Sequence, residues 1–405
     1  MFWSRVFLPF ALGYFVSQLF RSVNAVVSAD LIDELAIDAW TVGLLTSVYF
    51  LAFASVQLPV GVALDRYGPR RTEAALLLFT AVGALVFGAA ETPNGLALGR
   101  ALIGLGVSAC LMASFHAFIL WAPPARLPFM NGSVMAVGAA GALTATVPVE
   151  WAIGTIGWRA LFTWLSAATV LCAAVLFFVV TDNKSAHPKE SLGAVTRGLA
   201  DVFRSRVFWS IAPFSIMHQG AYLSIQSLWA GPWLATVAGL PRDEVATHLL
   251  MLASAMGVGF ISLGFLAERL GRLGVPTVAV WVGSSIAFQC AQLGLVLEWT
   301  RYARGLWSAF GLFGAAGMLS YVILTRSFPV AMAGRVNTGL NVFVFIGAFA
   351  LQAGIGAIVQ RYSQPGAPFS PEGFQLAFGT TLALQTLALV WLLARAPWRQ
   401  GTRDH

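Results

Sequence analysis

The sequence predicts an all-α, polytopic membrane protein with twelve transmembrane helices, and two observations carry that prediction. First, 58% of the 405 residues are hydrophobic and only 10% are charged, whereas about a quarter of the residues in soluble domains are charged. Second, the chain contains twelve apolar runs long enough to cross about 30 Å of hydrocarbon at 1.5 Å per residue. With a mean hydropathy of +0.78, this composition excludes disordered, collagen-like and nucleic-acid-binding proteins.

The twelve runs set the expected helices in order along the chain. The first follows Met1–Arg5 with no small-residue cleavage site, so we expect a retained span rather than a signal peptide. The predicted spans are 6–29, 41–64, 73–92, 95–120, 129–149, 159–181, 207–230, 246–267, 275–298, 303–325, 336–360 and 374–395.

The longest polar stretch falls at the middle of the chain and divides it into two halves. We expect a six-helix bundle over 1–181, a cytoplasmic linker over 182–206 and a second six-helix bundle over 207–405. A short pattern of small and charged residues recurs 203 residues later, with Gly61, Asp65, Arg66 and Gly68 matched by Gly264, Glu268, Arg269 and Gly271. Halves with an even number of spans keep their orientation, so we expect parallel repeats.

The basic residues predict the orientation. With twelve spans, 17 of the Lys and Arg residues in the connections and toward the span ends belong to one face and 6 to the other. The face rich in Lys and Arg is normally cytoplasmic. We therefore expect an integral protein of the cell inner (plasma) membrane with both termini in the cytoplasm.

The segment from Gly61 to Arg71 resembles the signature between the second and third helices of the major facilitator superfamily. Its residues are Gly61, Asp65, Arg66, Gly68, Arg70 and Arg71, with an echo at Glu268 and Arg269. Gly61 suits a close helix approach, and Gly68 suits a tight turn. The resemblance implies that these residues belong to a cytoplasmic gate. It also implies two six-helix bundles that rock about a substrate site between them, with a monomer sufficing.

Two further segments are similar to family patterns, and one departs from them. Arg100, Gly104 and Gly106 match an RxxxGxG pattern in the fourth helix, and Gly157-Trp158-Arg159 opens the sixth. The fifth helix reads Gly138-Ala-Ala-Gly141 instead of the GxxxGP core of antiporters. This departure disfavours a drug/proton antiporter.

In the family fold, the first and seventh helices line the central cavity, and both carry polar residues here at helical spacing. Because lipid does not tolerate such faces, we expect them to surround the substrate. The predicted substrate-binding residues are Tyr14, Gln18, Arg21 and Asn24 on the first helix and His218, Gln219, Tyr222 and Gln226 on the seventh.

Arg21 carries most of the functional prediction, because an Arg within the hydrocarbon costs at least about 2.5 to 3.5 kcal/mol. Its planar guanidinium suits a carboxylate or phosphate. The stretch Arg21-Ser-Val-Asn24 also resembles the first helix of the organic anion:cation symporter branch. The alternative is that Arg21 pairs with Asp30 or Glu34, or extends to the membrane surface. With no second Arg on the seventh helix, a monocarboxylate or an amphipathic acid fits best.

The coupling group is less defined by the sequence. His218 is a central group that can titrate near neutral pH, and His116, Glu150 and Arg100 are further candidates. Simple structural roles remain open for each, and Glu150 could instead pair with Arg159 at the outer surface.

We therefore predict a secondary active transporter of a small organic solute, an organic anion for preference, working by proton symport or facilitated diffusion. The alternatives are an efflux transporter for hydrophobic compounds and a transporter-like sensor. No catalytic or metal-binding motif is present, so we expect no enzyme activity, no cofactor and no metal. The expected partners are the small-molecule substrate, a proton as a coupling ion, and the lipid bilayer.

Overall fold

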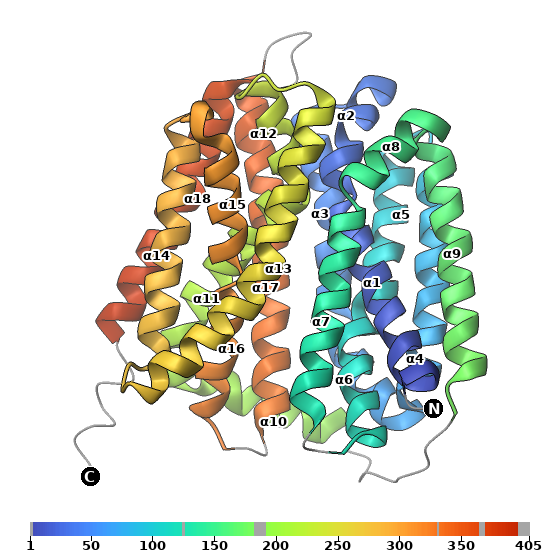
Figure 1. The fold of residues 1–405 in the computed structure, drawn as a ribbon, viewed down its shortest axis with the longest axis vertical. Coiled ribbons are helices and arrows are strands. Elements are labelled where there is room, and N and C mark those ends of the chain that lie inside the picture. The colour runs from blue at the N-terminus through green and yellow to red at the C-terminus, as the bar shows by residue number, and fades with distance from the viewer. Residues whose placement is uncertain (1–2, 124–125, 182–191, 330–331, 364–368, 396–405) are drawn as a thin grey trace.

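The computed structural model describes residues 3–123, 126–181, 192–329, 332–363 and 369–395, and throughout these ranges the regular structure is helical. The helices form two halves that stand side by side (Figure 1). One half holds the elements up to α9, and the other those from α11 onward.

The N-terminal half accounts for the first six predicted spans, several of them broken into two helices. Its elements are η1 (Trp3–Phe7), α1 (Leu8–Ser22), α2 (Asn24–Leu35), α3 (Ala39–Ser55), α4 (Gln57–Ala89), α5 (Pro93–Gly106), η2 (Val107–Ala109), α6 (Cys110–Trp121), α7 (Leu127–Thr144), α8 (Val147–Ile156) and α9 (Trp158–Val179).

The C-terminal half accounts for the other six. Its elements, preceded by α10 (Leu192–Arg204), are α11 (Arg206–Ser224), η4 (Ile225–Trp229), α12 (Ala230–Thr236), α13 (Arg242–Arg272), α14 (Thr277–Val296), η5 (Thr300–Tyr302), α15 (Ala303–Gly314), α16 (Gly317–Arg326), α17 (Ala333–Arg361) and α18 (Pro371–Arg395).

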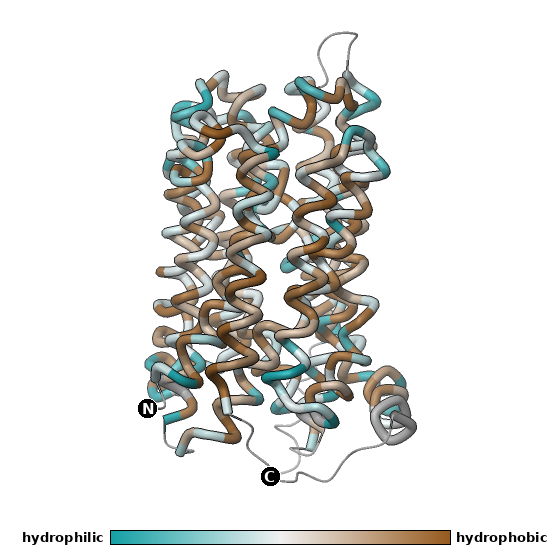
Figure 2. The backbone as a smooth tube through the Cα atoms, turned by 90° about the vertical axis from the view of Figure 1, so that its right-hand side faces the viewer, coloured by the Kyte–Doolittle hydropathy of each residue, from teal (hydrophilic) through white to brown (hydrophobic). Residues whose placement is uncertain are grey.

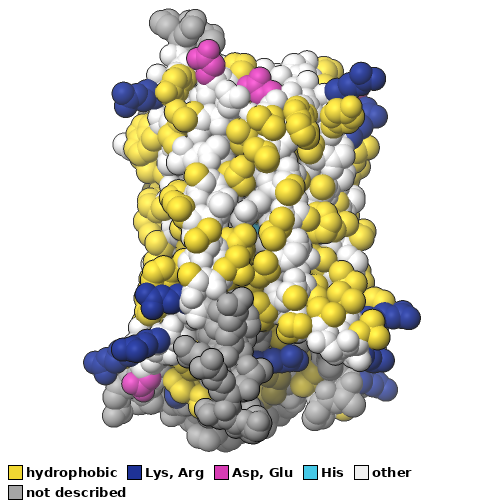
Figure 3. All heavy atoms as spheres, turned by 90° about the vertical axis from the view of Figure 1, so that its left-hand side faces the viewer, with side chains coloured by type: hydrophobic (Ala, Val, Ile, Leu, Met, Phe, Trp, Pro, Cys, Tyr) yellow, Lys and Arg dark blue, Asp and Glu magenta, His cyan; other side chains and the backbone are white. Residues whose placement is uncertain are grey.

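The apolar character of these helices agrees with a membrane protein. Among the described residues, eight helices are long and apolar enough to cross a membrane, and the number rises to eleven if each of three bent helix pairs forms one span. The remaining predicted span, the seventh (207–230), corresponds to the run from α11 through η4 to α12. Apolar residues fill the middle of the molecule, and hydrophilic residues lie toward both ends (Figure 2). On the face in Figure 3, the basic side chains likewise gather near the two ends.

The predicted linker contains a helix. α10 lies at the lower end in Figure 1, and the start of η1 and the end of α18 lie toward the same end. We call it the linker end and the opposite one the far end. On the C-terminal half, Phe203 of α10 packs edge-on against Phe343 of α17, with ring centroids 5.3 Å apart. The rest of the predicted linker, 182–191, lies outside the described residues.

Glycines of the sequence motifs allow the helices to pack closely. A Cβ on Gly104 would overlap the backbone of Tyr49, and one on Gly141 would overlap the backbone of Phe15. The RxxxGxG pattern therefore brings the fourth span against the second, and the Gly138-to-Gly141 segment brings the fifth against the first.

The segment from Gly61 to Arg71 agrees with the expectations from its sequence only in part. Gly68 has φ +79°, a conformation that favours glycine, and it turns the chain inside α4. Gly61, however, has no atom of another described helix within 4 Å of where a Cβ would stand. The expected close helix approach at Gly61 is therefore wrong for this conformation, because no helix packs against that position.

Candidate functional site

Arg21 lies where the first span breaks. α1 ends at Ser22 and α2 begins at Asn24, with a bend of 44° between the two parts. Its guanidinium carbon stands 5.7 Å from the ring centre of Phe53 on α3 and 5.4 Å from that of Phe345 on α17. These two rings are stacked, 4.0 Å apart. Because α3 and α17 belong to different halves, Arg21 lies at the boundary between the halves.

The charge of Arg21 is not balanced by a protein carboxylate. Within the described residues it forms no ion pair, and its buried Nε has no hydrogen-bond partner. The two carboxylates that could have neutralised it are engaged elsewhere: Asp30 with Arg242, and Glu34 with Arg159. An unpaired guanidinium at this depth is suited to an anionic ligand.

Arg100 supports the break in the first span. It is 2% exposed, and its Nη1 donates to the carbonyl oxygen of Phe20 at 3.0 Å. With the amide of Asn24 turned so that its oxygen faces Arg100, that oxygen accepts from Nη2 at 3.1 Å. The guanidinium also lies 4.8 Å from the ring centre of Tyr49. Asn24 and Arg100 thus hold the chain on either side of Arg21.

The other predicted residues of the first span lie within the N-terminal half. Gln18 donates to the hydroxyl of Tyr14 at 2.7 Å, and both side chains are buried. The Tyr14 ring lies against Gly138 of α7. Tyr14 therefore lies where the first span packs against the fifth, and Gln18 is hydrogen-bonded to it.

The predicted residues of the seventh span do not share one face. His218 and Tyr222 are buried inside the C-terminal half, where the His218 ring lies 4.6 Å from that of Phe288. The Nε2 of His218 is 3.3 Å from the carbonyl oxygen of Gly314. Tyr222 packs on Gly314 as well. Both residues thus lie on the side of α11 that faces α14 and α15.

Gln219 and Gln226 have different surroundings. Gln219 is half-buried and donates to the hydroxyl of Ser215 at 3.0 Å. Gln226, in η4, donates to Ser22 at 3.3 Å across the boundary between the halves. Of the four predicted binding residues on the seventh span, Gln226 thus reaches the helix break beside Arg21.

At the far end, charged side chains join the two halves. Arg242 of α13 donates to Asp30 of α2, with Nη1 and Oδ1 2.9 Å apart, and also pairs with Glu150 of α8. The expected pair between Glu150 and Arg159 is wrong, since Arg159 pairs with Glu34 at 2.9 Å. Glu150 instead pairs with Arg242 of the other half, which also contacts Asp30.

Between this pair and Arg21, polar and small residues bring the halves into contact. Gln352 of α17 donates to Thr46 of α3 at 2.9 Å, and the side chain of Gln360 accepts from the backbone of Ala39 at 3.0 Å. Gly43 and Gly356 lie next to one another. The far half of the boundary is therefore closed.

The residues of the predicted gate lie at the linker end. Arg66, Arg71, Glu268 and Arg269 are exposed, and Arg70 donates to the carbonyl oxygen of Val180 at 2.9 Å. Glu268 pairs with Arg272 on its own helix. The side chain of Asp65 lies outside the described part of the structure. The remaining coupling candidate, His116 on α6, is half-buried.

Sequence reasoning missed Glu73. It stands at the edge of a predicted span, next to two arginines, and therefore looks like a surface residue. In the structure it is 0% exposed. The sequence offers no signal for this burial, since Glu73 is the first residue of its predicted span and follows Arg70 and Arg71 closely.

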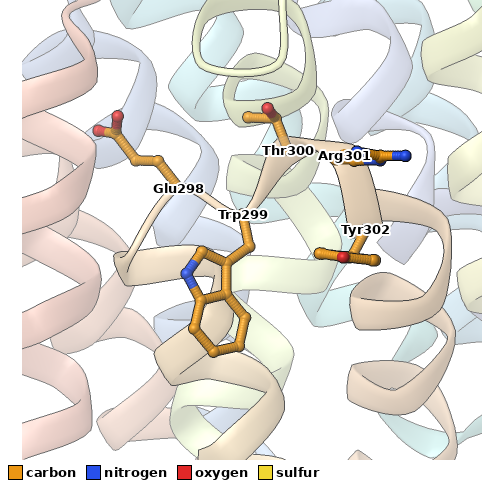
Figure 4. A pocket seen from close by; sticks show the side chains of 5 residues that line it. All are labelled: Glu298, Trp299, Thr300, Arg301 and Tyr302. Atoms are coloured by element: carbon orange, nitrogen blue, oxygen red, sulfur yellow. The ribbon is translucent and has the colours of Figure 1, made fainter.

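A surface depression lies away from these residues. Figure 4 shows its five lining residues, Glu298 to Tyr302, on the connection between α14 and α15. They are consecutive in the chain and come from one loop. Without convergent polar groups from other elements, this depression lacks the features of a substrate site.

The family model of the Major Facilitator Superfamily matches residues 10–352. The chain belongs to this superfamily. It is therefore a membrane transporter rather than an enzyme, and the predicted family and fold class are confirmed.

Individual relatives and solved structures agree with this assignment. The chain is 26% identical to the probable sulfoacetate transporter SauU of Cupriavidus necator, over 92% of this chain and 91% of that protein. It is 24% identical to the cis,cis-muconate transport protein of Acinetobacter baylyi, over 73% of each. The fold is similar to the inward-facing, occupied crystal structure of a bacterial homologue of the lysosomal transporter Spinster, with a TM-score of 0.76, 19% identity and 96% of both chains covered.

Proposed function

We propose that this superfamily member is a secondary active transporter that moves a small organic anion by alternating access, with Arg21 as the anion-binding group. The observation that carries the proposal is the unbalanced charge of Arg21 at the boundary between the halves. A permanent cation in a membrane interior is costly, and a transported anion would offset that cost in each cycle.

The aromatic rings beside Arg21 favour an organic rather than an inorganic anion. Phe53 and Phe345 flank the guanidinium with apolar surface, which suits a carboxylate carried on a carbon skeleton. The names of the two relatives, a sulfoacetate and a muconate transporter, point to the same class of substrate.

In this proposal the protein lies in the inner membrane of the cell, and its linker end faces the cytoplasm. The excess of basic residues predicted for that side supports this orientation. Because the far end is closed in this conformation, the anion in this proposal reaches Arg21 from the cytoplasmic side, and one chain holds the complete site. The two modes consistent with this scheme are proton symport and facilitated diffusion.

The test is the binding of two probes, sulfoacetate and cis,cis-muconate, to the purified protein by isothermal titration calorimetry. Arg21→Lys keeps the charge but loses the two parallel donors of the guanidinium. A lost hydrogen bond to a charged group is worth about 1.5 to 3 kcal/mol, so we expect the Kd to rise roughly 10- to 150-fold.

The matched control is Arg361→Lys, the same substitution at an exposed position at the end of α17. It should leave the Kd unchanged. If Arg21→Lys binds both probes as the wild type does, Arg21 is not the anion-binding group.

A further inference from the structure

Glu73 is a fully buried carboxyl group with no cationic partner among the described residues. It follows Pro69 by four residues, one turn into the part of α4 that resumes after the turn at Gly68. It is 0% exposed, and neither carboxyl oxygen accepts a hydrogen bond from a nitrogen or oxygen donor among the described residues; the donor beside it is the thiol of Cys110, a weak one. Buried polar groups are nearly always hydrogen-bonded, so such a group calls for an explanation.

The site around Glu73 is built by helices of the N-terminal half. A Cβ on Gly13 of α1 would overlap the carboxyl group, so the end of the Glu73 side chain lies directly against the backbone of α1 at this glycine. The titratable groups that face it from other helices are the thiols of Cys110 on α6 and Cys172 on α9. Figure 1 shows α1, α4, α6 and α9 together in this half.

The basic residues nearest in sequence have other surroundings. Arg70 donates to the carbonyl oxygen of Val180, and its guanidinium lies 5.0 Å from the ring centre of Phe177. Arg71 is exposed. Within the described residues, Glu73 is in no ion pair. An ionised carboxylate that faces only weakly donating thiols and no cation is strongly disfavoured in such a site, and the group takes up a proton instead.

We propose that Glu73 is a proton-binding site whose occupancy is linked to anion binding at Arg21, which makes the protein a proton symporter. This inference rests on the proposed function and names its coupling ion. The step is the uptake of one proton from water by the carboxylate, giving the neutral acid, and its release when α1 separates from Glu73.

The link to Arg21 follows from charge and distance along one helix. Gly13, which contacts Glu73, and Arg21 are eight residues apart on α1, or about 12 Å. At an effective dielectric constant of about 20, a unit charge at this distance changes proton affinity about tenfold. An anion that neutralises Arg21 removes the positive field that favours the carboxylate. Glu73 therefore binds its proton about tenfold more tightly, and by reciprocity the proton strengthens anion binding by the same factor.

The first test uses proteoliposomes and the probes sulfoacetate and cis,cis-muconate. Counterflow, the exchange of labelled for unlabelled probe, needs no proton movement, whereas uphill uptake under an inward proton gradient does. Glu73→Gln imitates the neutral acid, so we expect it to keep counterflow and lose the response to the gradient. The control Glu91→Gln, at an exposed position, should keep both.

The outcomes separate the two proposals. Counterflow without a gradient response in the wild type, or a gradient response that survives in Glu73→Gln, overturns the proton site and leaves anion transport intact. A wild type without counterflow of either probe speaks against the proposed substrate class instead.

A second measurement needs no substrate. The infrared spectrum of the wild type at neutral pH should contain the carbonyl band of a protonated carboxyl group that is missing from Glu73→Gln. Glu73→Leu, with an apolar side chain suited to the same site, provides a second variant should the first fail to fold. Identical spectra in this region would show that Glu73 is ionised and would refute the inference.

Discussion

The ion pairs of Arg242 at the far end predict how strongly the two halves are held together there. Arg242→Gln removes both ion pairs to the N-terminal half, those with Asp30 and Glu150. The Arg242 side chain is 44% exposed, so each pair is valued as a surface pair, at about 0.2 to 1 kcal/mol. Two pairs give about 0.4 to 2 kcal/mol, which raises the ratio of far-end-open to far-end-closed molecules roughly 2- to 30-fold.

The assay is a distance measurement between spin labels on the two halves at the far end. Labels at Asp33→Cys and Thr300→Cys, both exposed positions, would be read by double electron–electron resonance in a Cys290→Ser background. The other two cysteines are buried. We expect the fraction of long distances to grow in R242Q.

The control is R304Q, because Arg304 also lies at the far end but pairs with Glu244 of its own half, at 3.2 Å. That variant loses an ion pair without loosening the boundary. Equal distance distributions in R242Q and R304Q would refute the idea that Arg242 holds the far end closed.

Two further predictions concern the packing around Arg21, and both are read by thermal unfolding of the purified protein. Gly104→Ala should cost about 1 to 3 kcal/mol, because its Cβ meets the backbone of Tyr49. Gly154→Ala, with nothing within 4 Å of the new Cβ, should be neutral or stabilising by up to about 1 kcal/mol, and equal losses in both would contradict the packing argument. Arg100→Gln should cost about 1 to 3 kcal/mol by leaving the carbonyl of Phe20 without its donor, and it should also weaken probe binding because the break beside Arg21 loses support. If Arg100→Gln is as stable as the wild type, Arg100 does not stabilise the fold.

The sequence predicted those features that depend on one segment at a time. Hydropathy located the spans, and the spacing of Gly61, Asp65, Arg66 and Gly68 identified the family. Arg21 was singled out because a guanidinium in an apolar run is conspicuous whatever surrounds it. Its surroundings were not predicted, since Phe53 and Phe345 come from two other helices.

The sequence alone did not predict which way a side chain faces around its helix, or which residues from other helices contact it. The four residues of the seventh span follow helical spacing, but η4 is a π-helical segment from Ile225 to Trp229, which changes the register. Tyr222 therefore faces the interior of its half while Gln226 reaches Ser22. The burial of Glu73 likewise depends on Gly13, a glycine in a different helix.

The aromatic rings that lie beside Arg21 also join the two halves. Phe53 and Phe345 stack across the boundary, and the guanidinium lies against both rings. A movement that opens the far end must separate these rings, so it changes the environment of Arg21 at the same time. In the proposed cycle, an anion bound to Arg21 alters the energy of this contact directly, because a neutralised guanidinium attracts the aromatic faces less. Substrate binding and opening of the far end would then be coupled through a single contact, without a separate relay between site and gate.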